Sequence, residues 1–267
     1  MQTVINSHEE SINRAFSKQS AHYDAHDGAN LILRDMRKQV YRHIERFLKP
    51  NSRILELNAG TGIDAIHFVS LGHRVHATDI SKGMIQQIRK KQRGVSNALT
   101  FERLSYERLD LLDGQTFDFV FSNFGGLNCV SDLSVVTRQL PRLLNPGARI
   151  TLVIMPPVCP WELVTVLKGS GNALRRFRKG GVKAHVEGEY FDTYYHSLRD
   201  IKKAFGSEFR LLKSQGLAVF TPPPHHAAFP EKHPLVYKSL RKVDEMLRNH
   251  YPFNRWGDHI IASLQYR

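Results

Sequence analysis

The stretch Arg53-Ile-Leu-Glu-Leu-Asn-Ala-Gly-Thr-Gly-Ile-Asp-Ala65 decides the fold. A short apolar run that carries one acid, Glu56, leads into a turn with Gly60 and Gly62, and apolar residues at helical spacing follow. This order predicts a strand, a glycine turn and a helix. Glycines let a backbone approach a ligand closely, and the first N–H groups of a helix are free to bind it. We therefore expect a ligand site at the end of this strand.

An acid also ends the next apolar segment, which runs from Arg74 to Asp79. A carboxylate at the tip of a second strand can accept hydrogen bonds from both hydroxyls of a ribose. Two ligands fit this arrangement. One is a dinucleotide, because residues 60–65 match G-x-G-x-x-A, and the other is S-adenosylmethionine. Glu56 favours the second, because an acid near the end of the first strand suits a cationic amino group and has no role beside a pyrophosphate.

The stretch resembles motif I of the class I methyltransferases, written acid-x-G-x-G-x-G, with Glu56, Asn58, Gly60 and Gly62 in those places. Asn58 replaces the first glycine of that pattern. Asparagine tolerates a left-handed backbone better than most residues, so we expect the turn to be preserved.

Three further segments resemble the same family and occur in its order: Asp79-Ile-Ser-x-x-Met84, Phe117-Asp-Phe-Val120 and Pro146-Gly147. The resemblance covers residues 12–155 and the last strands. It implies an α/β fold with a doubly wound, Rossmann-like, seven-stranded sheet that is mostly parallel and has one antiparallel strand near the C-terminus.

The resemblance also implies which residues bind S-adenosylmethionine. The segment from Phe16 to Asp24 resembles an arm that closes over the cofactor in the ubiquinone, menaquinone and biotin-synthesis methyltransferases. Ser105 stands where the family often has an aspartate for the adenine amino group, and it can accept one hydrogen bond but carries no charge. The implied cofactor-binding residues are Tyr23, Glu56, Asn58, Ala59, Gly60, Gly62, Asp79, Ile80, Met84, Ser105, Tyr106, Asn123 and Phe124.

We expect three parts along the chain. Residues 1–48 form an N-terminal arm and helix, residues 49–155 form the Rossmann-like core, and residues 156–267 hold substrate-lid insertions and the C-terminal strands of the same sheet. Insertions on the ligand side of such a core are where lids lie. Within the core, residues 132–144 are predicted to form one helix, with a strand at 149–155.

Composition sets limits on the setting and the partners. The 267 residues carry a formal net charge of +13, which favours an acidic carrier protein, a small anion or a nucleic acid, and is equally compatible with a basic surface that aids solubility. No apolar run approaches the roughly 20 residues of a membrane span, and no signal-peptide pattern opens the chain. Cys129 and Cys159 lack metal-ligand spacing, so we expect a cytoplasmic protein without a metal.

Candidate catalytic groups lie in the expected lid regions. A sulfonium methyl group is already activated, so holding the acceptor atom about 3–3.5 Å away and in line supplies most of the rate. A general base helps when the acceptor is a hydroxyl or a carbon acid. His225, His226 and Tyr195 are our candidates for that base. The basic residues Arg175, Arg176 and Arg178 are candidates for holding a carboxylate or phosphate.

The favoured function is S-adenosylmethionine-dependent O- or C-methylation of a small molecule, anionic or carrier-bound, as in cofactor or secondary-metabolite biosynthesis. The insertions would enclose such an acceptor, and no Asn-Pro-Pro-Tyr-type base-methylating motif follows the fourth expected strand. An RNA methyltransferase is an alternative suggested by the charge. A non-catalytic cofactor-binding protein is another, suggested by Asn58 and Ser105, and a dehydrogenase is a fourth.

Overall fold

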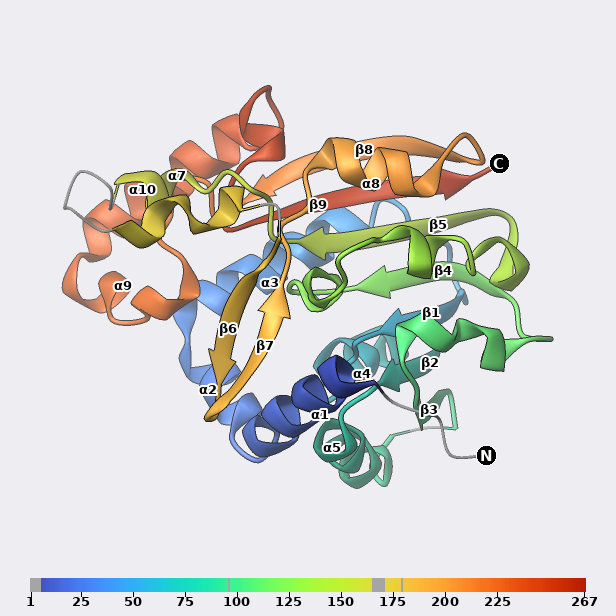
Figure 1. The fold of residues 1–267 in the computed structure, drawn as a ribbon. Helices are drawn as coiled ribbons and strands as arrows, with labels where there is room; N and C mark the ends of the chain where they lie inside the picture. Colours follow the sequence, from blue (N-terminus) through green and yellow to red (C-terminus); the bar gives the residue numbers. More distant parts are fainter. Residues whose placement is uncertain (1–5, 96, 165–170, 179) are drawn as a thin grey trace.

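A seven-stranded sheet forms the centre of the structure, a computed structural model that describes residues 6–95, 97–164, 171–178 and 180–267 (Figure 1). Its strands are β1 (Arg53–Leu57), β2 (Arg74–Asp79), β3 (Leu99–Arg103), β4 (Phe117–Ser122), β5 (Leu144–Ile154), β8 (Phe209–Leu217) and β9 (His259–Tyr266). Their spatial order is β3-β2-β1-β4-β5-β9-β8. The pairs from β3 to β5 are parallel, whereas β9 runs antiparallel to β5 and β8. The predicted doubly wound, mostly parallel sheet is confirmed.

Helices flank the sheet, and several begin at a polar capping residue. Asn6 and Glu9 form a reciprocal capping box at the start of α1, and Ser81 accepts from the backbone of Met84 at the start of α5. No helix in the described ranges is long and apolar enough to cross a membrane. The helices are α1 (Ser7–Gln19), α2 (Tyr23–Ala29), α3 (Leu31–Ile44), α4 (Ile63–Ser70), α5 (Lys82–Gln92), α6 (Ser134–Thr137), α7 (Pro160–Val164), α8 (Leu198–Phe205), α9 (Phe229–Lys232) and α10 (Pro234–Leu247).

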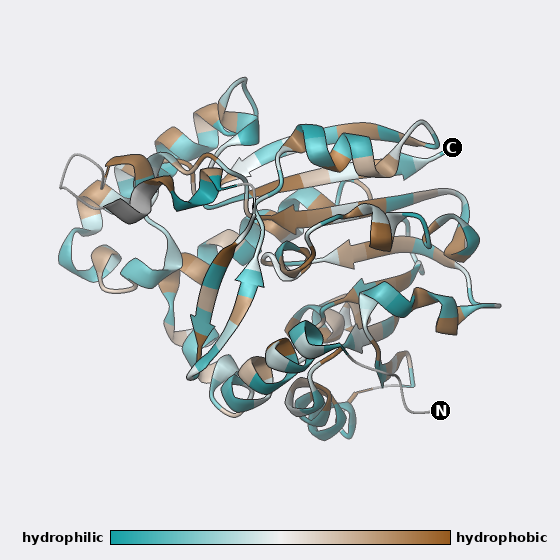
Figure 2. Cartoon of the chain, viewed as in Figure 1, coloured by the Kyte–Doolittle hydropathy of each residue, from teal (hydrophilic) through white to brown (hydrophobic). Residues whose placement is uncertain are grey.

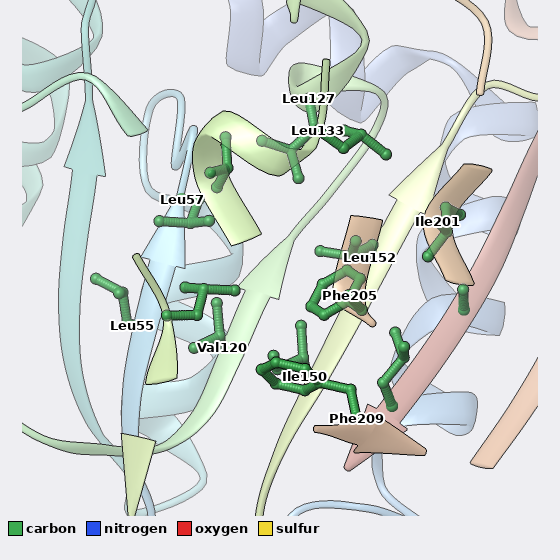
Figure 3. Close-up of a cluster of buried hydrophobic side chains, with 14 of the residues drawn as sticks. Leu55, Leu57, Val120, Leu127, Leu133, Ile150, Leu152, Ile201, Phe205 and Phe209 are labelled. Atoms are coloured by element: carbon green, nitrogen blue, oxygen red, sulfur yellow. The ribbon is translucent and has the colours of Figure 1, made fainter. Parts of the chain in front are cut away.

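Each face of the sheet has its own hydrophobic core, because successive residues of a strand point to opposite faces. On one face, Leu55 and Ile150 pack with residues of α8, such as Phe205 (Figure 3). On the other face, Ile54 and Phe119 pack with residues of α3, α4 and α5. Strands that are buried on both sides are almost continuously apolar, which Figure 2 shows for β4 and β5. The carboxyl ends of β1, β2 and β4 share one edge of the sheet because these strands are parallel. The two cores hold the strands in place on both faces.

The prediction of a single helix over residues 132–144 is wrong. The chain there forms the four-residue helix α6, a short 3-10 turn at Pro141–Leu143, and the start of β5 at Leu144. Pro141 has no backbone N–H and its ring clashes with the preceding helical turn, so a helix cannot continue through it. The apolar spacing still places Val136 and Leu140 in the core, which explains why the pattern resembled a longer helix.

A separate two-stranded hairpin, β6 (Val182–Val186) and β7 (Glu189–Thr193), lies between β5 and α8 in the sequence. In Figure 1 it extends from the end of β5 across to α1. Glu189 accepts from Arg14 at 3.0 Å and from Lys18 at 2.7 Å, and the Phe16 and Phe191 rings lie 5.6 Å apart. The N-terminal arm and the hairpin therefore meet above the carboxyl edge of the sheet.

The fit of α1 on α5 depends on Gly83. A Cβ atom there would lie 2.7 Å from the backbone of Ser17, closer than real Cβ contacts. We expect Gly83→Ala to push α1 away from α5 and to lower the free energy of unfolding in urea by about 1–3 kcal/mol. Limited proteolysis should then cleave the N-terminal arm faster.

Gly28→Ala in α2 is the matched control, because a Cβ there would meet nothing within 4 Å. The greater helix propensity of alanine should leave this variant as stable as the wild type or more stable by about 1 kcal/mol. Equal destabilisation by the two substitutions would contradict the close packing of α1 on α5.

Candidate active site

The glycine turn after β1 has the left-handed backbone that the sequence predicts. Asn58, Gly60 and Gly62 all have positive φ angles, of 47°, 57° and 80°. The amide of Asn58 also bridges two strands, since it donates to the carbonyl oxygen of Asn123 at 2.9 Å and accepts from the Ser122 hydroxyl at 2.6 Å. Asparagine therefore preserves the turn and adds a link between the ends of β1 and β4.

Asp79 ends β2 and points back to the turn. One carboxylate oxygen accepts from the backbone N–H of Gly60 at 2.8 Å, and the other accepts from that of Ser81 at 2.8 Å. Burial raises the pKa of Asp79 to about 6, and the two backbone hydrogen bonds lower it only in part. The group is thus a buried carboxylate that loses its charge in mildly acidic solution.

A cavity of about 570 Å³ opens at this edge of the sheet. The turn and the ends of β2 and β4 form one side, and α1 and the β6–β7 hairpin form the other. A Cβ on Gly60 would meet nothing within 4 Å, so the backbone there is open to the cavity. The predicted cofactor residues that line it are Tyr23, Asn58, Ala59, Gly60, Asp79, Ile80, Met84, Tyr106, Asn123 and Phe124.

Three predicted cofactor residues are not among those that line the cavity. Gly62 begins α4, and the hydroxyl of Ser105 accepts from the backbone of Glu107 at 3.1 Å. Glu56 is 1% exposed, and one of its carboxylate oxygens is buried without a hydrogen-bond partner in the described chain. Burial, and then the negative charge of Asp64, raise the pKa of Glu56 well above its usual value.

The sequence analysis did not identify the side chains that complete the cavity. Ile12 comes from α1, Val182 and Val186 come from β6, and Met155 follows β5. Their signals were present in the sequence, since Ile12 and Phe16 stand four residues apart on one helical face and the valines alternate as in a half-buried strand. The sequence patterns did not indicate which of these residues lie opposite one another across the cavity.

A buried ion pair, also missed, supports the wall of the cavity. Arg37 of α3 donates to Asp64 of α4 at 2.5 Å and to Asp27 of α2 at 2.6 Å. Asp64 also accepts from Tyr41 at 2.5 Å and from the Asn123 amide at 2.9 Å. Burial alone would raise the pKa of Asp64, but the Arg37 charge and the three hydrogen bonds hold it below its usual value. Asp64 is therefore ionised at neutral pH.

The N-terminal arm is fastened to the glycine turn by Asp24. Its carboxylate pairs with Lys91 at 2.5 Å and accepts from the Thr61 hydroxyl, while Lys91 donates to the Thr61 carbonyl oxygen at 2.9 Å. The neighbouring Tyr23 lines the cavity, and burial raises its pKa to about 12. The predicted arm therefore lies over the turn.

The predicted catalytic residues divide into two groups. Tyr195 lines the cavity, as does Arg175, whereas His225 and His226 lie in a 3-10 turn that contributes nothing to the described lining. Tyr195 is partly buried, and this burial raises the pKa of its phenol, so it is protonated at neutral pH and donates rather than accepts a proton.

The buried guanidinium of Arg176 is not part of the described cavity lining, because it is paired with two carboxylates. It donates to Glu162 at 2.7 Å and to Asp258 at 2.9 Å. The ligand atoms of Cys159, Glu162 and Asp258 lie within 4.8 Å of one another, a spacing that a metal ion could use. Arg176 already balances the negative charge of Glu162 and Asp258, so these carboxylates do not require a metal ion.

These features define the class of the domain: a class I methyltransferase domain of the S-adenosylmethionine-dependent type. The residues present fit that cofactor, because an acid ends β2, the backbone at Gly60 is open, and Arg37 has a buried Nε without a hydrogen-bond partner in the described chain. Residues 54–147 match the model of the family described as "Methyltransferase domain".

Particular relatives share parts of the chain. Demethylmenaquinone methyltransferase of Clavibacter sepedonicus is 33% identical over 140 residues, which are 50% of this chain and 56% of that protein. A SAM-dependent methyltransferase of Methanosarcina mazei superposes with a TM-score of 0.58 at 18% identity, over 85% of this chain and 97% of that one. The 1,6-didemethyltoxoflavin-N1-methyltransferase of Burkholderia thailandensis, solved with S-adenosylhomocysteine, superposes with a TM-score of 0.56 at 15% identity, over 100% and 92%. The chain thus spans about half the length of its curated relative.

The buried ion pair yields a stability prediction. Arg37→Gln removes the only cation that hydrogen-bonds to Asp27 and Asp64 in the described chain, leaving two buried carboxylates. We expect the free energy of unfolding to fall by about 3–5 kcal/mol in urea titrations. Arg34→Gln, the same change on the exposed face of α3, is the control and should leave the unfolding midpoint unchanged. A comparable loss in both variants would contradict the role of the buried pair.

Proposed function

We propose that this protein transfers the methyl group of S-adenosylmethionine to an oxygen or carbon atom of a small molecule. The observation that carries the proposal is the cavity at the carboxyl edge of the sheet, which the glycine turn borders on one side and α1 and the β6–β7 hairpin border on the other. When bound, the cofactor supplies a methyl group already activated by a positively charged sulfur. The chain then has to orient two ligands and exclude water from between them.

The cofactor half of the cavity lies against the sheet. In our proposal Asp79 accepts from the ribose hydroxyls, Ile80 and Met84 pack against the adenine ring, and the backbone at Asn123 adjoins the methionine portion. We assign the guanidinium of Arg37, which lines the same cavity, as the positive charge that faces the carboxylate of the cofactor's methionine portion. Glu56 lies behind the turn, so its contact with the amino group stays a prediction.

The acceptor half lies under the hairpin. Phe16, Val182 and Phe191 make this part largely apolar, while the lining also includes the cations Arg175 and Lys183 and the hydroxyl of Tyr195. Such a lining suits an acceptor with an apolar body and a single polar or anionic group, free or attached to a carrier. An RNA base would have to leave its strand and pass under the hairpin to reach the same space, which makes RNA the weaker alternative.

Calorimetric titration with S-adenosylmethionine, S-adenosylhomocysteine and NAD tests the cofactor. We expect micromolar binding of the first two and a large loss of affinity in Asp79→Ala. Transfer of a labelled methyl group is then measured on a panel of small acceptors. Demethylmenaquinone comes first, because the Clavibacter relative is named for it. Binding of NAD alone would contradict the proposal, and cofactor binding without turnover of any acceptor would favour a non-catalytic protein.

The pKa of Asp79 gives a pH dependence with a definite sign. Ribose hydroxyls donate to the charged carboxylate, so binding requires the deprotonated form, and the pKa is about 6. We expect the Kd of S-adenosylhomocysteine to be constant above about pH 7 and to rise about tenfold per unit below pH 6.

The matched control for this titration is Asp79→Asn, which should bind more weakly and lack the dependence between pH 5 and 7. The ionisations of the ligand itself are the same for both proteins, so they cancel in the comparison. Parallel pH curves for the two proteins would show that another group controls binding.

A further inference from the structure

We infer, on the basis of the proposed methyl transfer, that His259 is the general base that removes the proton from the acceptor, with Asp258 as the positioning residue for its ring. Neither residue was a candidate from the sequence, because both lie at the start of a strand of the sheet rather than in a lid. Figure 1 shows the start of β9 beside the end of β5, near the base of the β6–β7 hairpin.

One nitrogen of the imidazole is fixed by a buried chain of contacts. Nδ1 of His259 lies 3.0 Å from Oδ2 of Asp258, and Oδ1 of Asp258 accepts from Arg176 at 2.9 Å. All three residues are less than one-tenth exposed. Burial would raise the pKa of Asp258, but its contacts with His259 and Arg176 hold it well below its usual range. An ionised carboxylate accepts a hydrogen bond from Nδ1–H, so the tautomer that this contact selects for the neutral imidazole carries its lone pair on Nε2.

The other nitrogen is unpartnered and lies beside the cavity wall. No group in the described ranges hydrogen-bonds to Nε2 of His259. A Cβ on Gly125 would lie 3.4 Å from Nε2 and 3.2 Å from Cε of Met155, and both Gly125 and Met155 line the cavity. The ring of Phe124, which also lines it, meets the imidazole edge to face at 5.7 Å. His259 is not itself among the lining residues, but because Gly125 has no side chain, Nε2 packs directly behind this part of the wall. In our proposal it reaches the acceptor from there, directly or through one water.

This geometry supports one proton transfer. The bond between the acceptor atom and the methyl carbon forms while the carbon–sulfur bond breaks, and its electron pair stays on sulfur. The proton that leaves the acceptor passes to Nε2, and the carboxylate of Asp258 stabilises the resulting imidazolium. Solvent later removes that proton, so the net change is replacement of a hydrogen on the acceptor by methyl.

Other candidate bases lack one of these features. Tyr195 is protonated at neutral pH. His225 and His226 lie in a 3-10 turn that contributes no residue to the described lining, whereas His259, although not a lining residue itself, packs against two that are, Phe124 and Gly125. His185 lines the cavity, but its ring is exposed, lies 4.6 Å from that of Tyr190, and forms no hydrogen bond with a carboxylate of the described chain. An oriented Nδ1 distinguishes His259 from each of them.

Carbethoxylation by diethyl pyrocarbonate tests the assignment without knowledge of the acceptor, because the reagent attacks an unprotonated imidazole nitrogen. Mass spectrometry of peptides from the full chain gives the rate at each histidine. We expect His259 to react, and saturating S-adenosylmethionine to slow that reaction at least about fivefold. The exposed His250 is the internal control and should react equally with and without the cofactor.

Asp258→Asn adds a readout of the positioning role. The asparagine amide can donate to Nδ1, which moves the imidazole proton to Nε2, so His259 should react more slowly although the cavity is intact. An unreactive His259 in the wild type, or a rate that neither the cofactor nor this substitution changes, would overturn the inference. Failure of the cofactor to bind in calorimetry is a separate result and removes the proposed function itself.

The second test measures kcat with any acceptor identified in the methyl-transfer panel. His259→Ala should lower kcat by about 10²- to 10⁴-fold with the Kd of S-adenosylhomocysteine within twofold, whereas His250→Ala should match the wild type. His185→Ala should cause a much smaller loss. An unchanged kcat in His259→Ala, or a collapse of kcat only in His185→Ala, would overturn the assignment.

Discussion

The buried pairing of Arg37 with Asp64 is the interaction on which the rest of the site depends. It joins α3 to the helix that follows the glycine turn, and through the Asn123 amide it reaches the end of β4. A charge at this depth is tolerated only when it is paired and hydrogen-bonded, so its partners have little freedom to move. The shape of the turn, the position of the β4 loop and the direction of Arg37 Nε are therefore set together rather than separately.

This constraint divides the cavity into a rigid half and an adaptable half. The half against the sheet is formed by backbone and by side chains at strand ends, which the two hydrophobic cores hold in place. The opposite half consists of α1 and the hairpin, which are joined through Glu189 and its partly exposed partners Arg14 and Lys18. Such exposed pairs contribute little to stability in water, so the apolar contact between α1 and the hairpin, which includes Ile12, Phe16 and Phe191, is the main attachment of this half.

The sequence was sufficient for features that are local along the chain. Patterns within a few residues predict the strand, turn and helix around Gly60, the acid at Asp79 and the succession of strands along the chain. The helix expected at 132–144 failed because apolar spacing was weighed above Pro141. The Arg37 pair and the contact of His259 with Asp258 and Arg176 could not be predicted, since they join residues whose meeting is decided only by packing. His225 and His226 were expected to act because they lie in an insertion. The 3-10 turn that holds them contributes no residue to the described lining, and their catalytic role stays a prediction.

The hairpin that roofs the cavity is a self-contained piece of chain. Its two strands pair only with each other, and the sheet hydrogen-bonds without them. A change in its length or side chains would alter which molecules enter while leaving the nucleotide turn and its supporting ion pair intact. In the proposed function, the segment that contacts the acceptor is thus separate from the segment that binds the cofactor. Within the proposed function, residues 182–193 are therefore the segment whose exchange would change the lining of the acceptor side while leaving the residues of the glycine turn unchanged.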